Sequence, residues 1–338
     1  MHDIRFAVAG CGAIGVVHAR AILATPGAVL TAGFDIRPEA AKAFGAEFHC
    51  DAVTDYDALL EREDVDAIAI CTPSGLHSTL AVKAARAGKH VICEKPLDTE
   101  SGRAADMLSA CRENGVTLFP VLQYRLDPAA LAVKAALEQG KLGRLFWGSA
   151  HVIWYRDDGY YNSGSWRGTA ALDGGVLMNQ AIHHLDLLLF FMGKPLSVRG
   201  KCARLRGLEM EDAAVACLEF PGGALGSVEA TTDAKPGLYS EVSLYGEKGS
   251  VILRNNRLFF SSVPDAPELD ALVDPTAIYT ENKDARISHE GHSRQYADIV
   301  SALQNGRAPA VTAEDALTSL NTVLGIYRAS AENRTVQL

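Results

Sequence analysis

Short apolar runs alternate with helix-like segments through the first third of the chain. Ile4 to Ala9 and Ala28 to Phe34 are apolar runs of strand length, and apolar positions recur with helical spacing from Ile14 to Leu23 between them. The alternation continues to about residue 122, which predicts a parallel sheet with helices on both faces. The other elements expected here are helices at 38–48, 56–63, 77–87 and 101–114, and strands at 51–55, 65–71, 91–93 and 117–122.

The alternation of strand-like and helix-like segments ends after residue 122. From 198 to about 262 short apolar runs are separated by hairpin signals, among them Pro221-Gly222-Gly223, which predicts a mostly antiparallel sheet. The length of 338 residues also suggests two domains, and we place them at 1–122 and 123–338. The remaining expected elements are helices at 128–139, 176–192, 293–304 and 313–331, a strand at 145–154, and loops at 155–167 and 263–290.

Composition narrows the functional class. Apolar residues make up 48% of the chain, enough for a buried core, and a net charge of −9 argues against broad nucleic-acid binding. The first strand starts near the N-terminus, which leaves no room for a signal peptide, and the apolar stretch 185–192 is too short to span a bilayer. The seven cysteines include no CxxC pair, so we expect buried, reduced thiols in a cytoplasmic protein with no membrane or nucleic-acid partner.

The first loop carries a glycine pattern with a chemical reason for each position. Gly10, Gly12 and Gly15 follow the first strand at the spacing G-x-G-x-x-G, directly before the first expected helix. Gly10 permits a tight turn, Gly12 lets the backbone approach a pyrophosphate, and Gly15 lets the helix lie close to the strand. The start of the helix offers N–H groups and about half a positive charge to phosphates. Strand, glycines, helix and second strand together predict a dinucleotide site rather than an ordinary βα turn.

An acidic residue follows the second strand. Asp35 can accept hydrogen bonds from a ribose diol, and it would repel a 2′-phosphate by roughly 4 kcal/mol at ~4 Å and an effective dielectric of ~20. This favours NAD over NADP as the cofactor. Arg37 weakens the preference, because its guanidinium could neutralise such a phosphate.

Two polar segments follow the apolar strands expected at 65–71 and 91–93. Thr72-Pro73 and Glu94-Lys95-Pro96 fall at the carboxyl ends of these strands, where ligands of parallel sheets bind. Lys95 can act as an acid or base if burial or a nearby positive charge, such as that of NAD⁺, lowers its pKa. The alternative is a surface cation at a turn.

Polar residues interrupt the apolar helix expected at 176–192. Asn179, His183 and Asp186 are spaced by four and three and share one helix face, while Gln180 and His184 form another pair. Such groups are either tied into a network or aimed into a cleft, because unsatisfied polar groups in an apolar helix cost free energy. We predict that one of the two histidines is catalytic. Spacing does not choose between them, and a satisfied core histidine is the alternative.

The loop at 155–167 is rich in aromatic and charged residues. Aromatic faces pack on sugar C–H surfaces, and Arg and Asp side chains bind hydroxyls, so this loop suits a sugar; an ordinary interface loop is the alternative. No Cys or His cluster has zinc spacing, so no metal is expected. The residues singled out are Tyr155, Arg156, Asp157, Asp158, Gly159, Tyr160, Tyr161, Trp166 and Arg167.

These motifs occur together in the order of a known family. They are Gly10-x-Gly12-x-x-Gly15, Thr72-Pro73 with His77, Gly88-Lys89-His90-Val91 leading to Glu94-Lys95-Pro96, Gln123-Tyr124-Arg125, the segment from Gly174 to Asp186, His292 with Tyr296 and Asp298, and Arg307-x-Pro309-x-Val311. Over nearly its whole length the chain resembles the glucose–fructose oxidoreductase/inositol dehydrogenase/rhizopine catabolism family (Gfo/Idh/MocA) of sugar and cyclitol oxidoreductases.

The resemblance implies an α/β Rossmann domain with a parallel sheet over 1–122, and an α+β domain with a large open, mostly antiparallel sheet over 123–338. The second domain would bind the substrate and form homodimers or homotetramers through its exposed sheet face. Lys95 and His183 would be catalytic, and His184 would not. The expected cofactor-binding residues are Gly10, Gly12, Ala13, Ile14, Gly15, Asp35, Ile36, Arg37, Thr72, Pro73, His77, Glu94, Lys95, Gln123, Trp166 and Arg167. The expected substrate-binding residues are Lys95, Tyr124, Arg125, Tyr155, Arg156, Tyr161, Trp166, Asn179 and His183.

One position departs from the inositol dehydrogenase-like members, which carry Asp where this chain has Asn179. Asparagine can hydrogen-bond a hydroxyl but cannot relay a proton, and the chain looks closer to members acting on pyranosides and nucleotide sugars, such as 3-dehydrogenases. We therefore expect an NAD-dependent oxidoreductase of a secondary sugar hydroxyl. The alternatives are an inositol dehydrogenase, an NADPH-dependent keto-sugar reductase that uses Arg37, and a non-catalytic, cofactor-sensing regulator.

Overall fold

A computed structural model describes residues 2–277 and 288–338, which form two compact units. The first unit contains residues 2–123 and 288–317, and the second contains residues 124–277 and 318–338. The chain first changes unit after Gln123, beside the boundary that the sequence predicts. Residues 288–317 were expected in the second domain, but they pack with the first unit.

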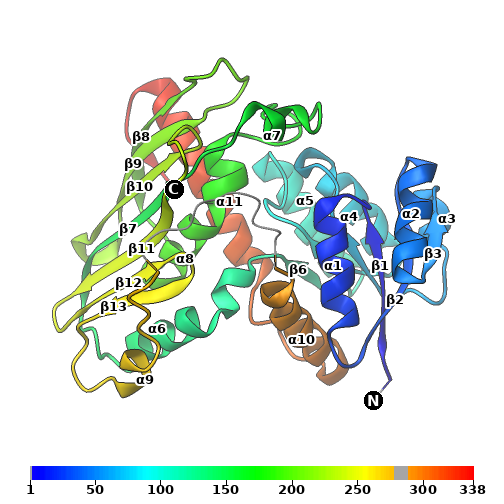
Figure 1. Ribbon diagram of the computed structural model, residues 1–338, viewed down its shortest axis with the longest axis horizontal. Helices are drawn as coiled ribbons and strands as arrows, with labels where there is room; N and C mark the ends of the chain where they lie inside the picture. Colours follow the sequence, from blue (N-terminus) through cyan, green and yellow to red (C-terminus); the bar gives the residue numbers. More distant parts are fainter. Residues whose placement is uncertain (1, 278–287) are drawn as a thin grey trace. The chain divides into compact units, whose positions relative to one another are not determined.

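The first unit is built on a six-stranded parallel sheet (Figure 1). Its strands are β1 (Ile4–Ala9), β2 (Ala28–Phe34), β3 (Asp51–Val53), β4 (Ala67–Ile70), β5 (His90–Cys93) and β6 (Leu118–Pro120). Its helices are α1 (Ala13–Leu23), α2 (Pro38–Phe48), α3 (Tyr56–Leu60), α4 (His77–Arg86), α5 (Ser101–Glu113) and α10 (Glu290–Asn305). The strand order is β3-β2-β1-β4-β5-β6, so the topology reverses between β1 and β4, where ligands of such sheets bind.

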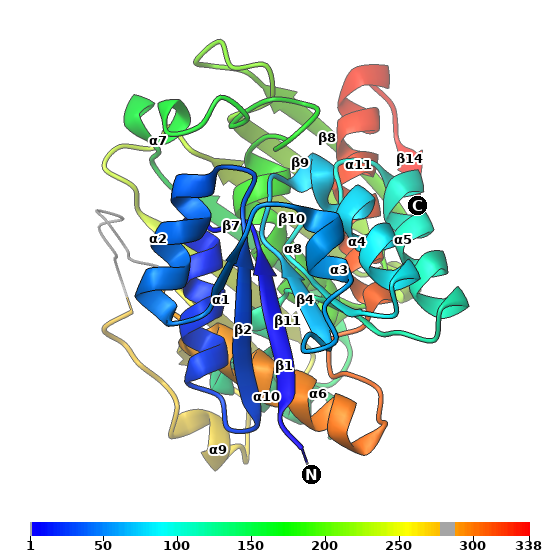
Figure 2. The same ribbon diagram turned by 90° about the vertical axis from the view of Figure 1, so that its right-hand side faces the viewer.

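Helices cover both faces of this sheet. Figure 2 shows α1 and α2 on one face and α3, α4 and α5 on the other. Helix α10 comes from the last part of the chain, yet it packs against α1 and β1. Its Tyr296 lies edge-on to Phe6 of β1, with ring centroids 5.2 Å apart, and both side chains are buried. Burial of two large rings contributes a few kcal/mol toward holding this late segment on the sheet.

The second unit is built on an eight-stranded, mostly antiparallel sheet. Its strands are β7 (Leu145–Ile153), β8 (Ser197–Ala203), β9 (Ala213–Glu219), β10 (Leu225–Thr231), β11 (Tyr239–Gly246), β12 (Ser250–Arg254), β13 (Arg257–Ser261) and β14 (Val336–Gln337). Its helices are α6 (Pro128–Glu138), α7 (Asp158–Asn162), α8 (Ile182–Met192), α9 (Pro267–Asp270) and most of α11 (Ala313–Glu332). The strand order is β13-β12-β11-β7-β10-β9-β8-β14, and only β7 and β10 pair in parallel among the described strands of this sheet.

The two faces of this sheet differ. Helix α8 covers one face closely, because a Cβ at Gly148 of β7 would lie 2.1 Å from the sulfur of Met192 and 2.8 Å from Leu188. Side chains alternate along a strand, so the neighbouring Trp147 points to the opposite face, where Leu225 of β10 lies opposite it. Trp147 is 39% exposed and Leu225 is 48% exposed. The open sheet that the resemblance implies is therefore present.

Four local features differ from the sequence prediction. The single helix expected at 176–192 is a π-helical segment, Val176–Ala181, followed by α8. Helix α7 lies in the loop expected at 155–167, and α9 lies in the loop expected at 263–290. Residues 278–287 of that second loop lie outside the described residues. Strand β14 was not expected, because two residues carry no periodic signal.

The cysteines and helices bear on two further expectations. All seven cysteines are free thiols, but Cys217 is exposed, so the expectation of buried thiols is wrong for this residue. Cys71, Cys93 and Cys111 are buried, as expected. Among residues 2–277 and 288–338, we find no helix with the length and apolar character needed to cross a membrane.

Candidate functional site

The glycine turn of the first unit leaves room for a ligand at one of its three positions. Gly10 has a φ of +105°, and a Cβ there would lie 2.7 Å from the Cys71 carbonyl oxygen. A Cβ at Gly15 would lie 2.0 Å from the Gly10 carbonyl oxygen, so packing of the turn itself requires both glycines. A Cβ at Gly12 would meet no protein atom within 4 Å. Gly12 also caps α1 without any side-chain hydrogen bond to the first turn, so this position fits a pyrophosphate.

Asp35 lies directly after β2, where the predicted ribose contact belongs. Its buried carboxylate accepts hydrogen bonds from the Cys11 backbone N–H at 3.1 Å and the Arg37 backbone N–H at 3.0 Å. The Arg37 guanidinium adds two more contacts, through Nε at 3.1 Å and Nη2 at 3.2 Å. Burial would raise the pKa of Asp35, but these hydrogen bonds hold it below its ordinary value. The Arg37 charge is thus paired with Asp35, which reduces what it can offer a 2′-phosphate.

The ends of β4 and β5 are tied together by a buried histidine. His77 Nδ1 lies 2.8 Å from the Pro96 carbonyl oxygen, and Nε2 lies 2.9 Å from the Thr72 carbonyl oxygen. Burial lowers the pKa of His77, so its neutral ring donates to one carbonyl at a time. The contacts assign His77 to holding the turn at Lys95-Pro96, whose peptide bond is cis. Its predicted contact with a cofactor stays a prediction.

Two buried polar atoms beside these strand ends have no hydrogen-bond partner in the described part of the chain. They are the Thr72 hydroxyl oxygen and the Gln123 amide oxygen, and both residues belong to the predicted cofactor set. Buried polar groups are normally satisfied by protein, water or ligand. Their presence is consistent with a polar ligand at the carboxyl edge of the sheet.

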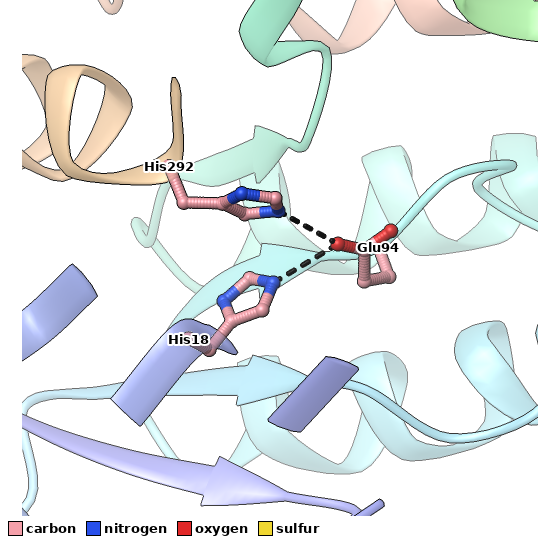
Figure 3. Close-up of side chains that lie close together, drawn as sticks. All are labelled: His18, Glu94 and His292. Carbon is pink, nitrogen blue, oxygen red and sulfur yellow. Dashed lines mark hydrogen bonds and ion pairs between the residues drawn. The ribbon is translucent and has the colours of Figure 1, made fainter. Parts of the chain in front are cut away.

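Glu94 lies in a buried cluster with two histidines of the same unit (Figure 3). Its Oε1 accepts from Nε2 of His18 at 3.0 Å and from Nε2 of His292 at 3.4 Å. Its Oε2 accepts from the Lys95 backbone N–H at 3.0 Å. Burial would raise the pKa of Glu94, but the hydrogen bonds from His18 and His292 hold it well below its ordinary range. Both carboxylate oxygens of Glu94 are thus used in protein contacts, and its predicted contact with the cofactor stays a prediction.

In the second unit, Asn179 lies in the π-helical segment rather than in a regular α-helix. The predicted sharing of one face by Asn179 and His183 assumed α-helical spacing, which does not apply across this segment. The Asn179 amide donates to the buried Asp173 carboxylate, and its oxygen accepts from the Tyr160 hydroxyl at 3.3 Å. The Asp that inositol dehydrogenase-like members carry at this position is thus replaced by an amide with a carboxylate beside it.

Tyr160 is the hub of the polar network around Asn179. Its hydroxyl accepts from Gln180 Nε2 at 2.7 Å and from Arg167 Nη1 at 2.8 Å. Gln180 in turn accepts from Arg156 Nη2 at 3.1 Å. The Arg167 guanidinium lies over the rings of Tyr160 and Trp166, 4.2 and 4.4 Å from their centroids. Planar donors stacked on aromatic rings are suited to a polyhydroxylated ring.

Two other residues of the predicted sugar loop lie with Arg206 beside this network, and the ring centroids of Tyr160 and Tyr161 are 5.2 Å apart. The Tyr161 hydroxyl is 2.9 Å from the Thr232 hydroxyl, and the Arg206 guanidinium lies 5.1 Å from the ring centroid of Tyr155. Arg206 also forms an ion pair with Asp233 at 2.5 Å. Nothing in the sequence pattern indicated Arg206, because it lies outside the aromatic loop.

The two adjacent histidines have different surroundings. His183 stacks on Tyr124 with ring centroids 4.6 Å apart and is 9% exposed. His184 is 2% exposed and lies against the rings of Tyr124 and Trp154. Burial lowers the pKa of His184 to about 4, and neither of its ring nitrogens has a hydrogen-bond partner among the described residues. His184 is therefore a neutral core residue near pH 7, which leaves His183 as the better candidate.

Arg125 and Asp186 form a buried ion pair. It shows whether Asp186, a polar residue in an apolar helix, is part of a network or points into a cleft. Nε and Nη2 of Arg125 each lie 2.7 Å from a different Asp186 oxygen, and the Ser319 hydroxyl donates to the same carboxylate at 2.7 Å. Asp186 is thus tied into a network. The buried Arg125 guanidinium therefore helps to hold α8 through Asp186, and its predicted contact with the substrate stays a prediction.

Glu211 explains the glycine pair that precedes the π-helical segment. A Cβ at Gly175 would lie 1.9 Å from Glu211 Oε2. Glu211 Oε1 accepts from the Leu177 backbone N–H at 3.0 Å and from the Tyr327 hydroxyl at 2.9 Å. Burial raises the pKa of Glu211 to about 7. This carboxyl therefore fastens the start of the segment that carries Asn179.

The structure sorts the predicted substrate residues into groups. Arg156, Trp166, Arg167 and Asn179 meet around Tyr160, whereas Tyr155 and Tyr161 lie with Arg206, and Tyr124 lies with His183. Their binding roles stay predictions. Sequence reasoning missed the hub role of Tyr160 and the roles of His18 and His292. The sequence signals available for the last two were the place of His292 in the family motifs and the position of His18 on the apolar buried face of α1.

Comparison with known proteins identifies the architecture. Residues 4–121 match the model of an oxidoreductase family with an NAD-binding Rossmann fold, and residues 134–338 match the C-terminal alpha/beta domain of the same family. The chain is 28% identical to inositol 2-dehydrogenase of Rhizobium meliloti strain 1021, covering 99% of both chains. It is 34% identical to dTDP-3,4-didehydro-2,6-dideoxy-alpha-D-glucose 3-reductase of Streptomyces violaceoruber, covering 74% of this chain and 72% of the other.

A solved structure is similar over the whole chain. It is the WlbA dehydrogenase from Bordetella pertussis in complex with NADH and UDP-GlcNAcA, with a TM-score of 0.92 and 33% identity, covering 100% of this chain and 98% of that chain. The two family models together span both units, in agreement with the resemblance that the motifs carry. The chain therefore belongs to the Gfo/Idh/MocA oxidoreductase family, and its first unit is an NAD-binding Rossmann fold.

Proposed function

We propose that this protein is an NAD(H)-dependent dehydrogenase that oxidises a secondary ring hydroxyl of a sugar. The proposed substrates are pyranosides or nucleotide sugars, with C3 as the first carbon to test. The full-length likeness to a dehydrogenase solved with NADH and UDP-GlcNAcA carries this proposal. The stacked guanidinium and phenol groups around Asn179 support it from the substrate side, because they match hydroxyl-rich rings.

The chain supplies positioning and proton transfer. Bound NAD⁺ provides the acceptor for the hydride that leaves the carbinol carbon. Lys95 and His183 handle the hydroxyl proton: one accepts it, and the Lys95 ammonium can also orient the hydroxyl. A positioned acid or base contributes roughly 10²–10⁴-fold in rate. Asn179 hydrogen-bonds a neighbouring hydroxyl, while Asp173 keeps its amide oriented.

Replacement of the two proton-handling residues tests the proposal. Lys95→Ala should lower kcat by roughly 10²–10⁴-fold while NADH affinity, measured by fluorescence, stays within a few-fold. His183→Ala should also lower kcat, whereas His184→Asn should not, provided that both variants fold. Lys83→Ala is the matched control, since Lys83 is a surface lysine of the same unit paired with Asp57. Unchanged turnover in Lys95→Ala would contradict the assignment.

Substrate and cofactor class are tested on the unmodified protein. A panel of free sugars, inositols and UDP-sugars, followed by NADH absorbance, should show turnover of at least one pyranoside or nucleotide sugar. Turnover of inositols alone would favour the inositol dehydrogenase alternative. Tighter binding of NADP⁺ than NAD⁺ would contradict our interpretation of Asp35 and Arg37 and favour the keto-sugar reductase. Absence of any turnover would favour a cofactor-sensing regulator.

The open face of the second sheet is the proposed homo-oligomer surface. It presents four large apolar side chains that are each more than a third exposed, those of Trp147, Leu225, Val215 and Phe260, and exposed apolar side chains on one face favour an interaction surface. A second copy of the chain, covering this face, gives the homodimer or homotetramer that the family resemblance implies. Light scattering should report two or four chains per particle, and a monomer at micromolar concentration would contradict this proposal.

A further inference from the structure

The buried cluster of His18, Glu94 and His292 adjoins Lys95 in the chain but belongs to no predicted catalytic set (Figure 3). We infer that it is a positioning network that holds an anionic Glu94 carboxylate against the Lys95 backbone. This inference rests on the proposed function, because it assigns the cluster a role relative to the Lys95 amine. It concerns the first unit alone, in which all four residues lie.

Each hydrogen bond of the cluster has one possible direction when Glu94 is ionised. An ionised carboxylate only accepts, so Nε2 of His18 and Nε2 of His292 both donate to Oε1. Burial lowers the pKa of His18, so its ring is neutral and its Nδ1 is an acceptor. The Tyr296 hydroxyl, 2.8 Å away, must then donate to that Nδ1. Tyr296 therefore donates to His18, and His18 donates to Glu94. With Glu94 ionised and His18 neutral, neither hydrogen bond can run in the opposite direction.

The cluster joins three segments that are distant in sequence. His18 lies on α1, directly after the glycine turn, Glu94 follows β5, and His292 lies on α10. His18 and His292 also stack edge-on with ring centroids 5.0 Å apart. A buried carboxylate is costly unless it is fully hydrogen-bonded, so this arrangement strongly favours one position for the strand end. Helix α10 is thereby part of the candidate site although it lies far along the chain.

Lys95 is held on two sides by this arrangement. Its backbone N–H donates to Glu94 Oε2 at 3.0 Å, and the carbonyl of the following Pro96 is held by His77 at 2.8 Å. An anion held at this position favours the ammonium form of a nearby amine, which gives the network an electrostatic as well as a positioning effect to test. The titratable groups that face Glu94 are His18 from α1, His292 and Tyr296 from α10, His77 from α4, Cys71 after β4 and Cys93 from β5.

The same three side chains could also ligate a metal ion. Two imidazoles and a carboxylate with ligand atoms within 4.8 Å are a donor set that zinc accepts. The hydrogen bonds, however, already pair the carboxylate with both ring nitrogens, and the second carboxylate oxygen is used by Lys95. Both carboxylate oxygens are therefore satisfied without an ion, and His292 Nδ1 is the one ring nitrogen of the cluster without a hydrogen-bond partner among the described residues. Metal analysis of the purified protein separates the two interpretations.

The first test is the pH profile of Glu94→Gln. Loss of the anion removes the charge that favours the Lys95 ammonium, so the acidic limb of log kcat should move to lower pH by roughly one unit. A merely structural role would lower kcat at every pH without moving this limb. His90→Gln, at the opposite end of β5 and bonded only to the Thr117 backbone among the described residues, is the matched control and should keep the wild-type limb. An unmoved limb in folded Glu94→Gln would overturn the inference.

Tyr296→Phe provides a second variant if Glu94→Gln does not fold. It keeps the ring that packs on Phe6 and removes only the hydroxyl that donates to His18. His18 Nδ1 can then accept a proton, which would partly neutralise Glu94, so we expect a smaller limb shift in the same direction. A shift toward higher pH would contradict the network as described.

The second test does not depend on sugar turnover. Amide hydrogen exchange at Lys95 should be at least about tenfold faster in Glu94→Gln, because the glutamine amide would face the Lys95 N–H with a donor. His90→Gln should not change this rate. If no sugar is oxidised, the proposed function fails, but the exchange result still decides whether Glu94 holds the Lys95 backbone. About one bound metal ion per chain, lost in Glu94→Gln, would overturn the positioning network in favour of a metal site.

Discussion

The two units hold their polar groups in opposite ways. In the first unit, Glu94 and its two histidines are buried, and every hydrogen bond has one direction. In the second unit, Tyr160 and Asn179 are only half-buried, and Tyr160 both donates to an amide and accepts from two donors. A desolvated ionic group cannot exchange partners cheaply, whereas half-exposed hydroxyl and amide groups can. The Glu94 cluster of the first unit thus holds one geometry, whereas the Tyr160 network of the second unit can exchange hydrogen-bond partners.

The largest expected effect distinguishes a glycine that the fold requires, Gly15, from a glycine that leaves room for a ligand, Gly12. Gly15→Ala forces a Cβ to within 2.0 Å of backbone, so it should destabilise the first unit by several kcal/mol and lower NADH affinity at least about 100-fold. Gly12→Ala meets no protein atom, so it should unfold at the wild-type urea concentration while NADH affinity falls about tenfold. Urea unfolding and NADH fluorescence titration measure the two quantities.

Comparison of the two glycine variants tests whether the open space at Gly12 serves a ligand. If Gly12→Ala destabilised the protein as much as Gly15→Ala, the open space at Gly12 would serve folding and not a ligand. If Gly12→Ala left NADH affinity unchanged, the pyrophosphate would not approach this position. Either result would contradict the assignment of the glycine turn.

The next effect concerns a part of the second unit that is as buried as the Glu94 cluster. Arg125→Leu leaves Asp186 without its bidentate partner in a buried site, which should cost about 3–5 kcal/mol in the free energy of unfolding. The double variant Arg125→Leu/Asp186→Leu removes both charges and should recover much of that loss. Chemical denaturation of wild type, single and double variants checks this. If the single variant were as stable as wild type, the pair would not hold α8.

The sequence predicted the first unit better than the second, for a local reason. The glycine turn, α1, β2 and Asp35 are consecutive in the chain, so one motif specifies them together. The open sheet of the second unit was expected, and its hairpins at Pro221-Gly222-Gly223 and 246–249 were visible as turn signals. The sequence therefore predicted whether a segment is a helix, strand or turn wherever residues close in the chain determine this.

The remaining features depend on contacts that no local pattern contains. The Tyr296 hydroxyl and His18 are 278 residues apart, and Arg125 and Asp186 are 61 residues apart. The start of the π-helical segment that carries Asn179 is fastened by Glu211, from the loop before β9, and Glu211 in turn is bonded by Tyr327 of α11. The motifs therefore show that Arg125 and Glu94 matter, but they do not show the protein groups that each side chain contacts.

The smallest effect tests whether Glu211, a buried acid that fastens the segment carrying Asn179, behaves unlike Glu94. Its pKa is about 7 in the folded chain against an ordinary value of 4.5, because burial disfavours its charge. Between these two pH values the unfolded chain has lost the proton and the folded chain keeps it, so the free energy of unfolding should fall by about 3 kcal/mol as pH rises from 4.5 to 7. Glu211→Gln cannot ionise, so it should match wild type near pH 4.5 and exceed it by up to about 3 kcal/mol at pH 8. Glu63→Gln, at an exposed position of the first unit, is the control, and a parallel pH profile for Glu211→Gln and wild type would show that Glu211 is ionised in the fold.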